Sequence, residues 1–291
     1  MEGRTLAGRA AVRRMRNLIL SLAAVLSTSA IPFVLSARGG DELLKYKDGN
    51  IDINRIVQES ARITEADRKA SAGYDYSETD LEGDGVRKTY AVHMLGGSPY
   101  RELIAIDGKP LPQEKEAEEK RKLAAEMTRR RRESASQRAD RIAEYEKESA
   151  RDRRFIAEFV NAFTFKLESE QEMDHREVYV VDAIPRPDFR PTDRESIVLT
   201  GMRGTLYIDK KTGQWVKAEA QVTHPVSIVG FLATVNPGTR FVLEKMPVDG
   251  GVWLARHFTM TARANILSFI PHHKHEDVSF FDYHKAAQPP S

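Results

Sequence analysis

Apolar and polar residues alternate with a period of two through much of the second half of the chain. Between residues 215 and 223 the even positions are small and apolar: Val216, Ala218, Ala220 and Val222. The odd positions there are lysine, glutamate and glutamine, and the segment 252–261 alternates similarly, with Phe258 and Met260 on its apolar side. This period is typical of a β-strand that buries one face and leaves the other in water.

Strand-like segments of this kind follow one another closely. After residue 163 they are 165–171, 177–183, 204–209, 214–223, 239–246, 253–264 and 278–284. Three more, at 74–78, 87–95 and 100–106, occur nearer the N-terminus. Short glycine-containing turns such as Asp107-Gly108 and Lys211-Thr212-Gly213 separate them. Consecutive strands joined by tight turns predict an antiparallel meander.

Three stretches have the period of an α-helix instead. Residues 41–70 carry apolar side chains at helical spacing, and Asp48-Gly49-Asn50 divides a short helix from a longer one. Residues 114–150 are rich in Glu, Lys, Arg and Ala and contain no Gly or Pro, which predicts one long, largely solvated helix or two end-to-end helices. An apolar stripe follows and should dock on the sheet: Phe155, Ile156, Phe159, Val160 and Phe163.

These elements predict an α+β fold with a large curved antiparallel sheet, a half-open β-barrel, covered by a few helices and carrying one long charged helix. A sheet that is apolar on one side and covered by few helices leaves an apolar concavity. We expect its lining or rim to comprise Ile228, Val229, Phe231, Leu232, Val216, Ala218, Ala220, Phe258 and Met260. The alternative for residues 226–232 is a buried crossover.

The N-terminus resembles a secretory signal. Several arginines, ending with Arg16, precede an apolar run whose continuous part is too short for a membrane span, which takes about 20 residues. Small residues offer cleavage sites at Thr28-Ser29-Ala30 and, less well, at Leu35-Ser36-Ala37. We therefore expect a signal peptide over residues 1–37, cleaved near 30 or 37, and export to the periplasm; an uncleaved N-terminal anchor is the alternative.

Composition excludes several classes of protein and site. The 45 basic and 43 acidic residues leave a net charge of only +2 and are interleaved, so nucleic acid is not an expected partner. The absence of cysteine rules out disulfides, thiolate metal sites and a cysteine nucleophile. His272-His273-Lys274-His275 has metal-ligand chemistry, but its neighbours suggest an exposed hairpin loop and adjacent strand residues point to opposite faces. We expect no metal and no cofactor.

Several motifs resemble those of a group of uncharacterised bacterial secreted proteins. They are the Tyr-x-Tyr-x-Glu segment at 74–78, the run Ile-Asp-Gly-Lys-Pro-Leu at 106–111, and Gly-Thr-Leu-Tyr-Ile-Asp at 204–209. These proteins in turn resemble the LolA-type outer-membrane lipoprotein carriers. That resemblance implies a half-open barrel plugged by helices that holds acyl chains. It covers residues 41–286 and implies one lipoprotein-carrier-like domain over 38–286, with a charged helical insertion at 113–150 and a disordered tail at 287–291.

The function expected from this is that of an exported, non-catalytic protein that binds a hydrophobic ligand such as an acyl chain or a lipoprotein. One alternative is an envelope protein-interaction or sensing module with a filled core, which would use the charged helix as a contact surface. A second alternative is a hydrolase with an unrecognised site. The sequence contains no Gly-x-Ser-x-Gly, His-Glu-x-x-His or phosphate-binding loop, so the motifs of common enzymes give that alternative no support.

Overall fold

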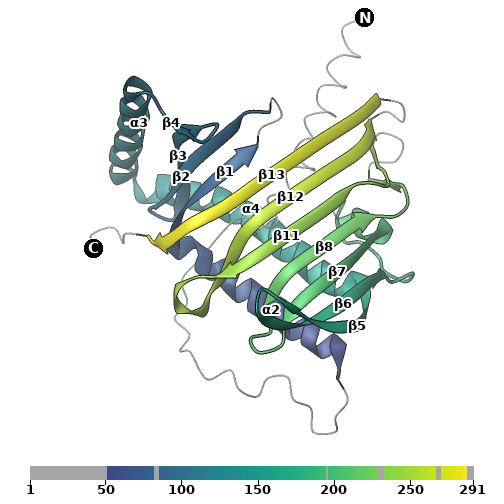
Figure 1. Ribbon diagram of the computed structural model, residues 1–291. Coiled ribbons are helices and arrows are strands. Elements are labelled where there is room, and N and C mark those ends of the chain that lie inside the picture. The colour runs from purple at the N-terminus through teal and green to yellow at the C-terminus, as the bar shows by residue number, and fades with distance from the viewer. Residues whose placement is uncertain (1–50, 82–84, 195, 229–232, 267–269, 287–291) are drawn as a thin grey trace, which may run out of the picture.

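Figure 1 shows the computed structural model of the protein, which describes residues 51–81, 85–194, 196–228, 233–266 and 270–286. The expected signal peptide at 1–37 and tail at 287–291 lie outside these residues. Three of the expected rim residues also lie outside them: Val229, Phe231 and Leu232.

All the strands belong to one antiparallel sheet of 13 strands. They are β1 Tyr74–Leu81, β2 Arg87–Leu95, β3 Ser98–Ile106, β4 Lys109–Pro110, β5 Phe163–Met173, β6 Arg176–Pro185, β7 Met202–Asp209, β8 Trp215–Val222, β9 Val226–Ser227, β10 Ala233–Val235, β11 Arg240–Pro247, β12 Trp253–Ile266 and β13 Ile270–Lys285. The main order is β4-β3-β2-β1-β13-β12-β11-β8-β7-β6-β5, and β9 and β10 pair beside β12. Within the described residues this order does not return to its start, so the sheet is open.

Most neighbouring strands are also neighbours in sequence, as expected of a meander. The exception is β1, which pairs with the last strand, β13, so that residues 74–80 lie against residues 278–285. Every segment expected to be a strand overlaps one. The prediction for the histidine run was wrong: residues 272–275 lie inside β13 and pair with β12 rather than forming a hairpin loop.

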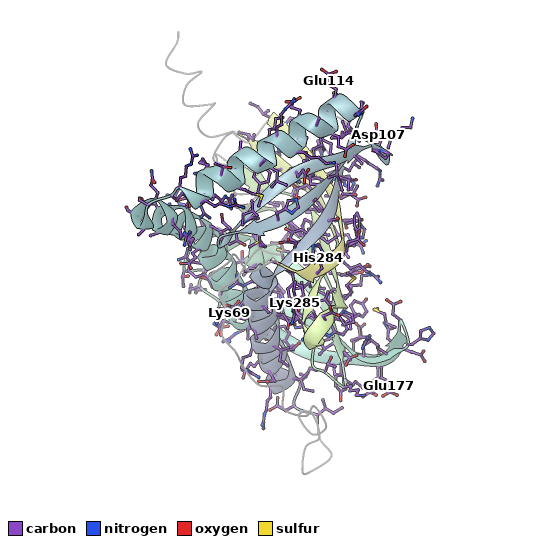
Figure 2. All side chains as sticks on the ribbon, turned by 90° about the vertical axis from the view of Figure 1, so that its left-hand side faces the viewer. Lys69, Asp107, Glu114, Glu177, His284 and Lys285 are labelled. Carbon is purple, nitrogen blue, oxygen red and sulfur yellow. The ribbon has the colours of Figure 1, made fainter. Side chains whose placement is uncertain are left out.

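Three long helices accompany the sheet: α2 Ile53–Ala70, α3 Gln113–Arg131 and α4 Ala135–Ala162. Short 3-10 turns occur at Ser71–Gly73, Ser196–Gly201 and Asp249–Gly251. Figures 1 and 2 show α2 and α4 on one face of the sheet and α3 beside the β2–β4 end. Helix α4 contacts both β3 and β5, so it reaches from one side of the open sheet to the other. The described helices include none with an apolar stretch that could cross a bilayer.

The charged stretch is two helices, and the second continues without a break into the apolar stripe. Ser134 separates them as the N-cap of α4. Its hydroxyl accepts a hydrogen bond from the Gln137 backbone N–H at 3.2 Å, and the Gln137 side chain accepts one from the Ser134 backbone N–H at 2.9 Å. This capping box satisfies two amides that the helix start would otherwise leave without partners.

We expect Ser134→Ala to lower the free energy of unfolding by about 1 kcal/mol, because it removes the cap from the first turn of α4. Chemical denaturation followed by circular dichroism measures this. Ser136→Ala is the matched control, since Ser136 is an exposed residue inside the same helix and its replacement should change stability by less than about 0.5 kcal/mol. Equal effects of the two substitutions would contradict the capping role.

The main core lies between the helices and the sheet face that they cover. Phe159 of α4 is its centre of aromatic contact: its ring centroid lies 4.8 Å from that of Phe163, 6.0 Å from Phe165 and 5.9 Å from Trp215. The edge-on arrangement with Trp215 is a favourable one for two aromatic rings. The expected docking of the α4 stripe on the sheet is therefore confirmed for these side chains.

A β-bulge in β8 changes which face its first residues occupy. Tyr207 pairs with Lys217 and Ile208 pairs with Trp215, which leaves Val216 as the extra residue. Trp215 consequently belongs to the main core, whereas Val216 packs with Val178 and Trp253 in a separate cluster. Tyr207 packs against that cluster and its neighbour Leu206 belongs to the main core, so the cluster lies on the opposite face. The prediction that Val216 shares a face with Ala218 was wrong.

Candidate functional site

The apolar side of the sheet faces α2 and α4, and the remaining expected lining residues lie on it. Phe258 and Met260 are 3% and 1% exposed and belong to the main core. Ile228 is also buried there. Ala218 and Ala220 pack against the same core but are only half-buried. The structure thus brings five of the expected residues together and leaves only the two alanines partly accessible.

The part of this face at β7 and β8 is built from small residues. Ala220 pairs with Gly204 of β7, which in turn pairs with Ala183 of β6. Gly204 is required by a close approach, because a Cβ atom there would lie 2.9 Å from the carbonyl oxygen of Glu219. Phe241 of β11 borders the small residues on the other side. The floor therefore has a low side-chain volume next to large core residues.

The apolar segment 228–232 is held to the core at both of its ends. The Ile228 backbone N–H donates to the carbonyl oxygen of Ala233 at 2.9 Å. Ala233 belongs to β10, which pairs with Ile266 near the end of β12. Both Ile228 and Ala233 are buried in the main core. Residues 229–232 are therefore anchored at the end of the apolar face where β12 terminates.

The opposite face of the same strands is polar and rich in ion pairs. Arg203 of β7 donates two hydrogen bonds to Asp182 of β6, and Arg240 of β11 donates one to Glu219 of β8 at 3.2 Å. A shallow charged groove runs over these residues and includes Glu168. A sheet with one apolar and one ion-paired face can hold an apolar ligand on the covered side only.

The sequence analysis missed a buried ion pair at one end of the core. Lys245 of β11 and Asp67 of α2 lie 3.6 Å apart (Nζ to Oδ2), and their side chains are 7% and 10% exposed. The carboxylate also accepts hydrogen bonds from the Gln214 side chain and from the Trp253 backbone N–H. Burial raises the pKa of Asp67 and lowers the pKa of Lys245, and the attraction between the two charges offsets part of both shifts.

Several polar atoms around this pair have no hydrogen-bond partner from the described part of the protein. They are Lys245 Nζ, Asp67 Oδ2, Thr64 Oγ1, Gln214 Oε1 and Trp215 Nε1. Thr64 lies one turn before Asp67 on the same face of α2. A signal for Lys245 was present in the sequence, because it follows Phe241 and Leu243 on the alternating inward positions of its strand. The pair has the composition of a polar site enclosed in the core.

A second charged pair lies where β1 meets β3. Arg101 donates to Glu78 at 2.5 Å, and its guanidinium lies 4.0 Å from the centre of the Tyr90 ring. Burial raises the pKa of Glu78, while Arg101 opposes that shift. Tyr76 and Tyr283 pack beside this pair with ring centroids 5.3 Å apart. These contacts join the β1–β4 strands to β13.

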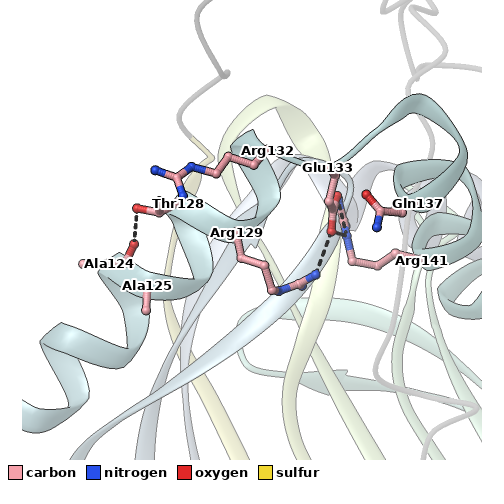
Figure 3. Close-up of a pocket in the computed structure, with 8 residues that line it drawn as sticks. All are labelled: Ala124, Ala125, Thr128, Arg129, Arg132, Glu133, Gln137 and Arg141. Carbon is pink, nitrogen blue, oxygen red and sulfur yellow. Dashed lines mark hydrogen bonds and ion pairs between the residues drawn. The ribbon is translucent and has the colours of Figure 1, made fainter.

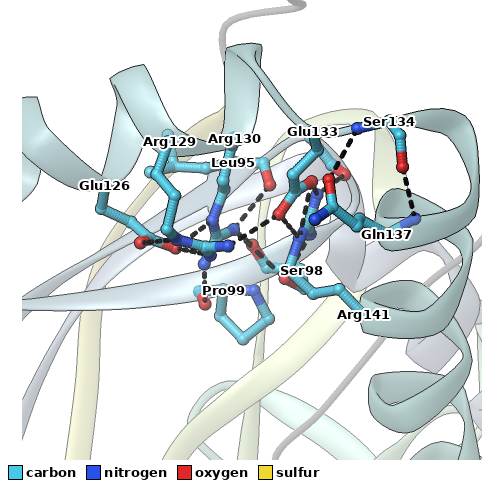
Figure 4. Close-up of polar contacts among 11 residues, drawn as sticks. Leu95, Ser98, Pro99, Glu126, Arg129, Arg130, Glu133, Ser134, Gln137 and Arg141 are labelled. Atoms are coloured by element: carbon cyan, nitrogen blue, oxygen red, sulfur yellow. Dashed lines mark hydrogen bonds and ion pairs between the residues drawn. The ribbon is translucent and has the colours of Figure 1, made fainter.

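The junction of α3 and α4 clasps the turn between β2 and β3, as Figure 4 shows. The buried Arg130 guanidinium donates to the backbone oxygens of Leu95 and Ser98 at 2.7 Å and of Pro99 at 3.2 Å, and to the carboxylate of Glu126 at 2.5 Å. The expectation that the arginine run at 129–132 is a solvated face was wrong for Arg130. Its buried carbonyl contacts explain why this arginine is enclosed.

Arg141 of α4 completes the clasp from the other helix. It donates to Ser98 Oγ at 2.7 Å, to the Gly96 carbonyl oxygen at 3.2 Å and to Glu133, whose side chain is only 4% exposed. Gly97, with φ +92°, lies so close to α4 that a Cβ atom would meet Ile142 Cδ1 at 3.1 Å. The turn and the two helices are therefore fitted to each other.

The histidines of β12 and β13 form pairwise contacts. His257 Nε2 lies 2.8 Å from Asp277 Oδ1, and His275 Nδ1 lies 3.3 Å from Thr261 Oγ1. Over the described ranges of the chain, no three His, Cys, Asp or Glu side chains are grouped so that they could share a metal ion.

No protein-family model matches the chain, and no curated protein matches it in sequence. Solved structures similar to it include a LolA superfamily protein from Nitrosomonas europaea, with 12% identity, a TM-score of 0.30, and coverage of 81% of this chain and 93% of that one. A DUF1329 family protein from Desulfovibrio piger has 8% identity, a TM-score of 0.26, and coverage of 79% and 92%. The Pseudomonas aeruginosa MucA/MucB complex structure has 12% identity, a TM-score of 0.22, and coverage of 80% and 99%.

These neighbours include the LolA-type proteins that the sequence motifs resemble. The likeness concerns the fold alone. Function must be inferred from the residues of this chain.

Proposed function

We propose that this protein is an exported, non-catalytic binding protein that takes a hydrophobic ligand, such as an acyl chain, on the covered face of its sheet. The observation that carries the proposal is the open sheet whose apolar face is covered by α2 and α4 while its other face is ion-paired. An apolar ligand gains free energy by leaving water only on the first of these faces.

The ligand would lie over the small residues of β7 and β8. Ala218 and Ala220 are the half-buried members of the expected lining, so a chain of methylene groups placed there covers apolar surface that water still reaches. Residues 228–232 would form its entrance, because they join two buried anchors at the edge of the apolar face. Phe258 and Met260 support this floor from the core and are too buried to contact a ligand without a rearrangement.

Lipid analysis and a displacement assay test the proposal. The mature protein is purified from its native compartment and extracted with organic solvent, and the extract is examined for lipid by mass spectrometry. A fluorescent fatty acid is then titrated into the delipidated protein. We expect Ala220→Leu to weaken fatty-acid binding about tenfold, because three additional carbon atoms fill the space over the floor.

Gln221→Leu is the matched control for that variant. Gln221 is the exposed neighbour of Ala220 on the same strand, and its side chain points to the polar face. It should leave fatty-acid binding unchanged, and thermal unfolding verifies that both variants are folded. An absence of bound lipid together with no binding of the fatty acid would contradict the proposal.

A filled core is the specific observation that favours a second candidate, an envelope protein-interaction module. Many apolar side chains occupy the space between the helices and the sheet, among them the four-ring cluster around Phe159. In this alternative the sheet is a scaffold and a protein partner binds the outer surface. Crosslinking in cells that detects a partner, combined with a negative fatty-acid titration, would favour this candidate over the first.

A further inference from the structure

Helix α3 contacts the rest of the protein along one side only. Leu123 and Met127 are half-buried and Arg130 is buried on the side toward β3. The outward side is fully exposed, and its central positions are small: Ala117, Ala124, Ala125 and Thr128. Their spacing of three, four and seven residues places them on one stripe of the helix. Small side chains let another helix approach closely.

The two ends of this outward stripe carry opposite charges. Glu114 lies in the first turn and Arg132 caps the last one, both exposed and on the stripe of the small residues. Neither side chain has an ion pair within the described residues. Glu118, also on the outward side, already pairs with Lys122 at 2.9 Å. The stripe is therefore acidic at one end, small in the middle and basic at the other end.

A groove continues from this stripe toward α4, as Figure 3 shows. Its volume is about 950 Å³, and its walls include Ala124, Ala125 and Thr128 from α3 and Gln137 from α4. Arg132 lies beside Thr128 in that view and points away from Glu133. Figure 2 shows Glu114 at the far, outer end of α3. The groove is thus open to a helix that packs along α3.

We propose that the outward stripe of α3 is a docking surface for the same stripe of a second copy of this chain, with the two helices antiparallel about a two-fold axis. An antiparallel pair places Glu114 opposite Arg132 of the partner subunit, and the symmetry repeats this contact at the other end. A stripe with opposite charges at its ends is complementary to itself only in that orientation. The axis falls near residue 123, midway between the two charges.

Single cysteines test this register directly, because the chain has no cysteine of its own. With the axis near residue 123, residue 124 lies about 3 Å along the helix from its symmetry mate, whereas residue 117 lies about 18 Å from its own. We expect Ala124→Cys to form a disulfide-linked dimer under mild oxidation at micromolar protein concentration. Ala117→Cys, an exposed alanine on the same stripe, is the matched control and should remain uncrosslinked.

Charge exchange provides an independent measurement. Light scattering coupled to size-exclusion chromatography should show a dimer that dissociates at higher salt, as expected of contacts between exposed charges. Glu114→Arg alone, or Arg132→Glu alone, creates two like-charged contacts and should weaken the dimer about tenfold or more. The double variant Glu114→Arg with Arg132→Glu restores opposite charges and should restore the dimer. Circular dichroism confirms that α3 is still helical in each variant.

Three outcomes would overturn the proposal. The first is a protein that stays monomeric at high concentration and gives no crosslink through Ala124→Cys. The second is a dimer whose stability none of these substitutions changes, because its interface then lies elsewhere. The third is a monomer that binds vesicles of anionic phospholipid through Arg132, since the basic end would then face a membrane. Fatty-acid binding is measured separately, so failure here leaves the proposed function intact.

Discussion

Replacing Lys245 with methionine is expected to lower the free energy of unfolding by about 3–5 kcal/mol, a large part of the stability of an ordinary domain. The substitution leaves the buried carboxylate of Asp67 without its cation. That carboxylate keeps only its hydrogen bonds from the Gln214 side chain and the Trp253 backbone N–H. Urea or guanidinium denaturation of the purified variant measures the loss.

The double variant Asp67→Leu with Lys245→Met is expected to recover most of that stability. It removes both charged groups, so neither desolvation penalty remains, and the apolar side chains fill a similar volume. Lys211→Met is the matched control because Lys211 is exposed in the turn before β8, and it should change stability by less than about 0.5 kcal/mol. A single variant at Lys245 as stable as the parent would show that the pair is not buried as described.

Replacing Arg130 with methionine is expected to release α3 from the sheet and to cost about 3 kcal/mol in local stability. The variant leaves backbone oxygens of the β2–β3 turn without their charged donor, and Glu126 loses one of its two arginine partners. Because α3 packs mainly on β3, little else holds it in place. Hydrogen exchange should therefore become faster for the amides of Gln113–Arg131 than for those of the central strands.

Arg131→Met is the control for this second prediction. Arg131 is the adjacent residue in the same run, and it is exposed. Its replacement should leave the exchange rates of α3 close to those of the parent protein. If the Arg130 variant protected α3 as well as the parent does, the carbonyl contacts of Arg130 would not be what holds the helix.

The strands and the open sheet could be predicted because alternation depends only on nearby residues. The alternation in residues 215–223, for example, correctly placed Ala218 and Ala220 on the covered face. It failed at Val216 because one extra residue in a bulge reverses the side-chain direction of everything before it. Nothing in the local sequence distinguishes that bulge from a regular strand.

The polar contacts in the core were harder to predict because they depend on residues far apart in sequence. Arg130 is the second of four consecutive arginines, and its burial depends on where the carbonyl oxygens of residues 95–99 lie. Lys245 was recognisable from its inward position on the strand. The partner Asp67 was not, since it lies on a helix whose packing against β11 only the fold reveals. The small floor of the candidate site likewise depends on which strands become neighbours.

The pairing of β1 with β13 has a consequence for the order in which the molecule assembles. A chain that is made or exported from its N-terminus presents β1 early, but the edge that receives it belongs to the final strand, Ile270–Lys285. The hairpin strands β1 to β4 must therefore wait, with one flank unpaired, until synthesis or translocation is complete. The arginine clasp and the charged helix α3 keep that waiting unit soluble, and a chain truncated before β13 would leave it permanently detached.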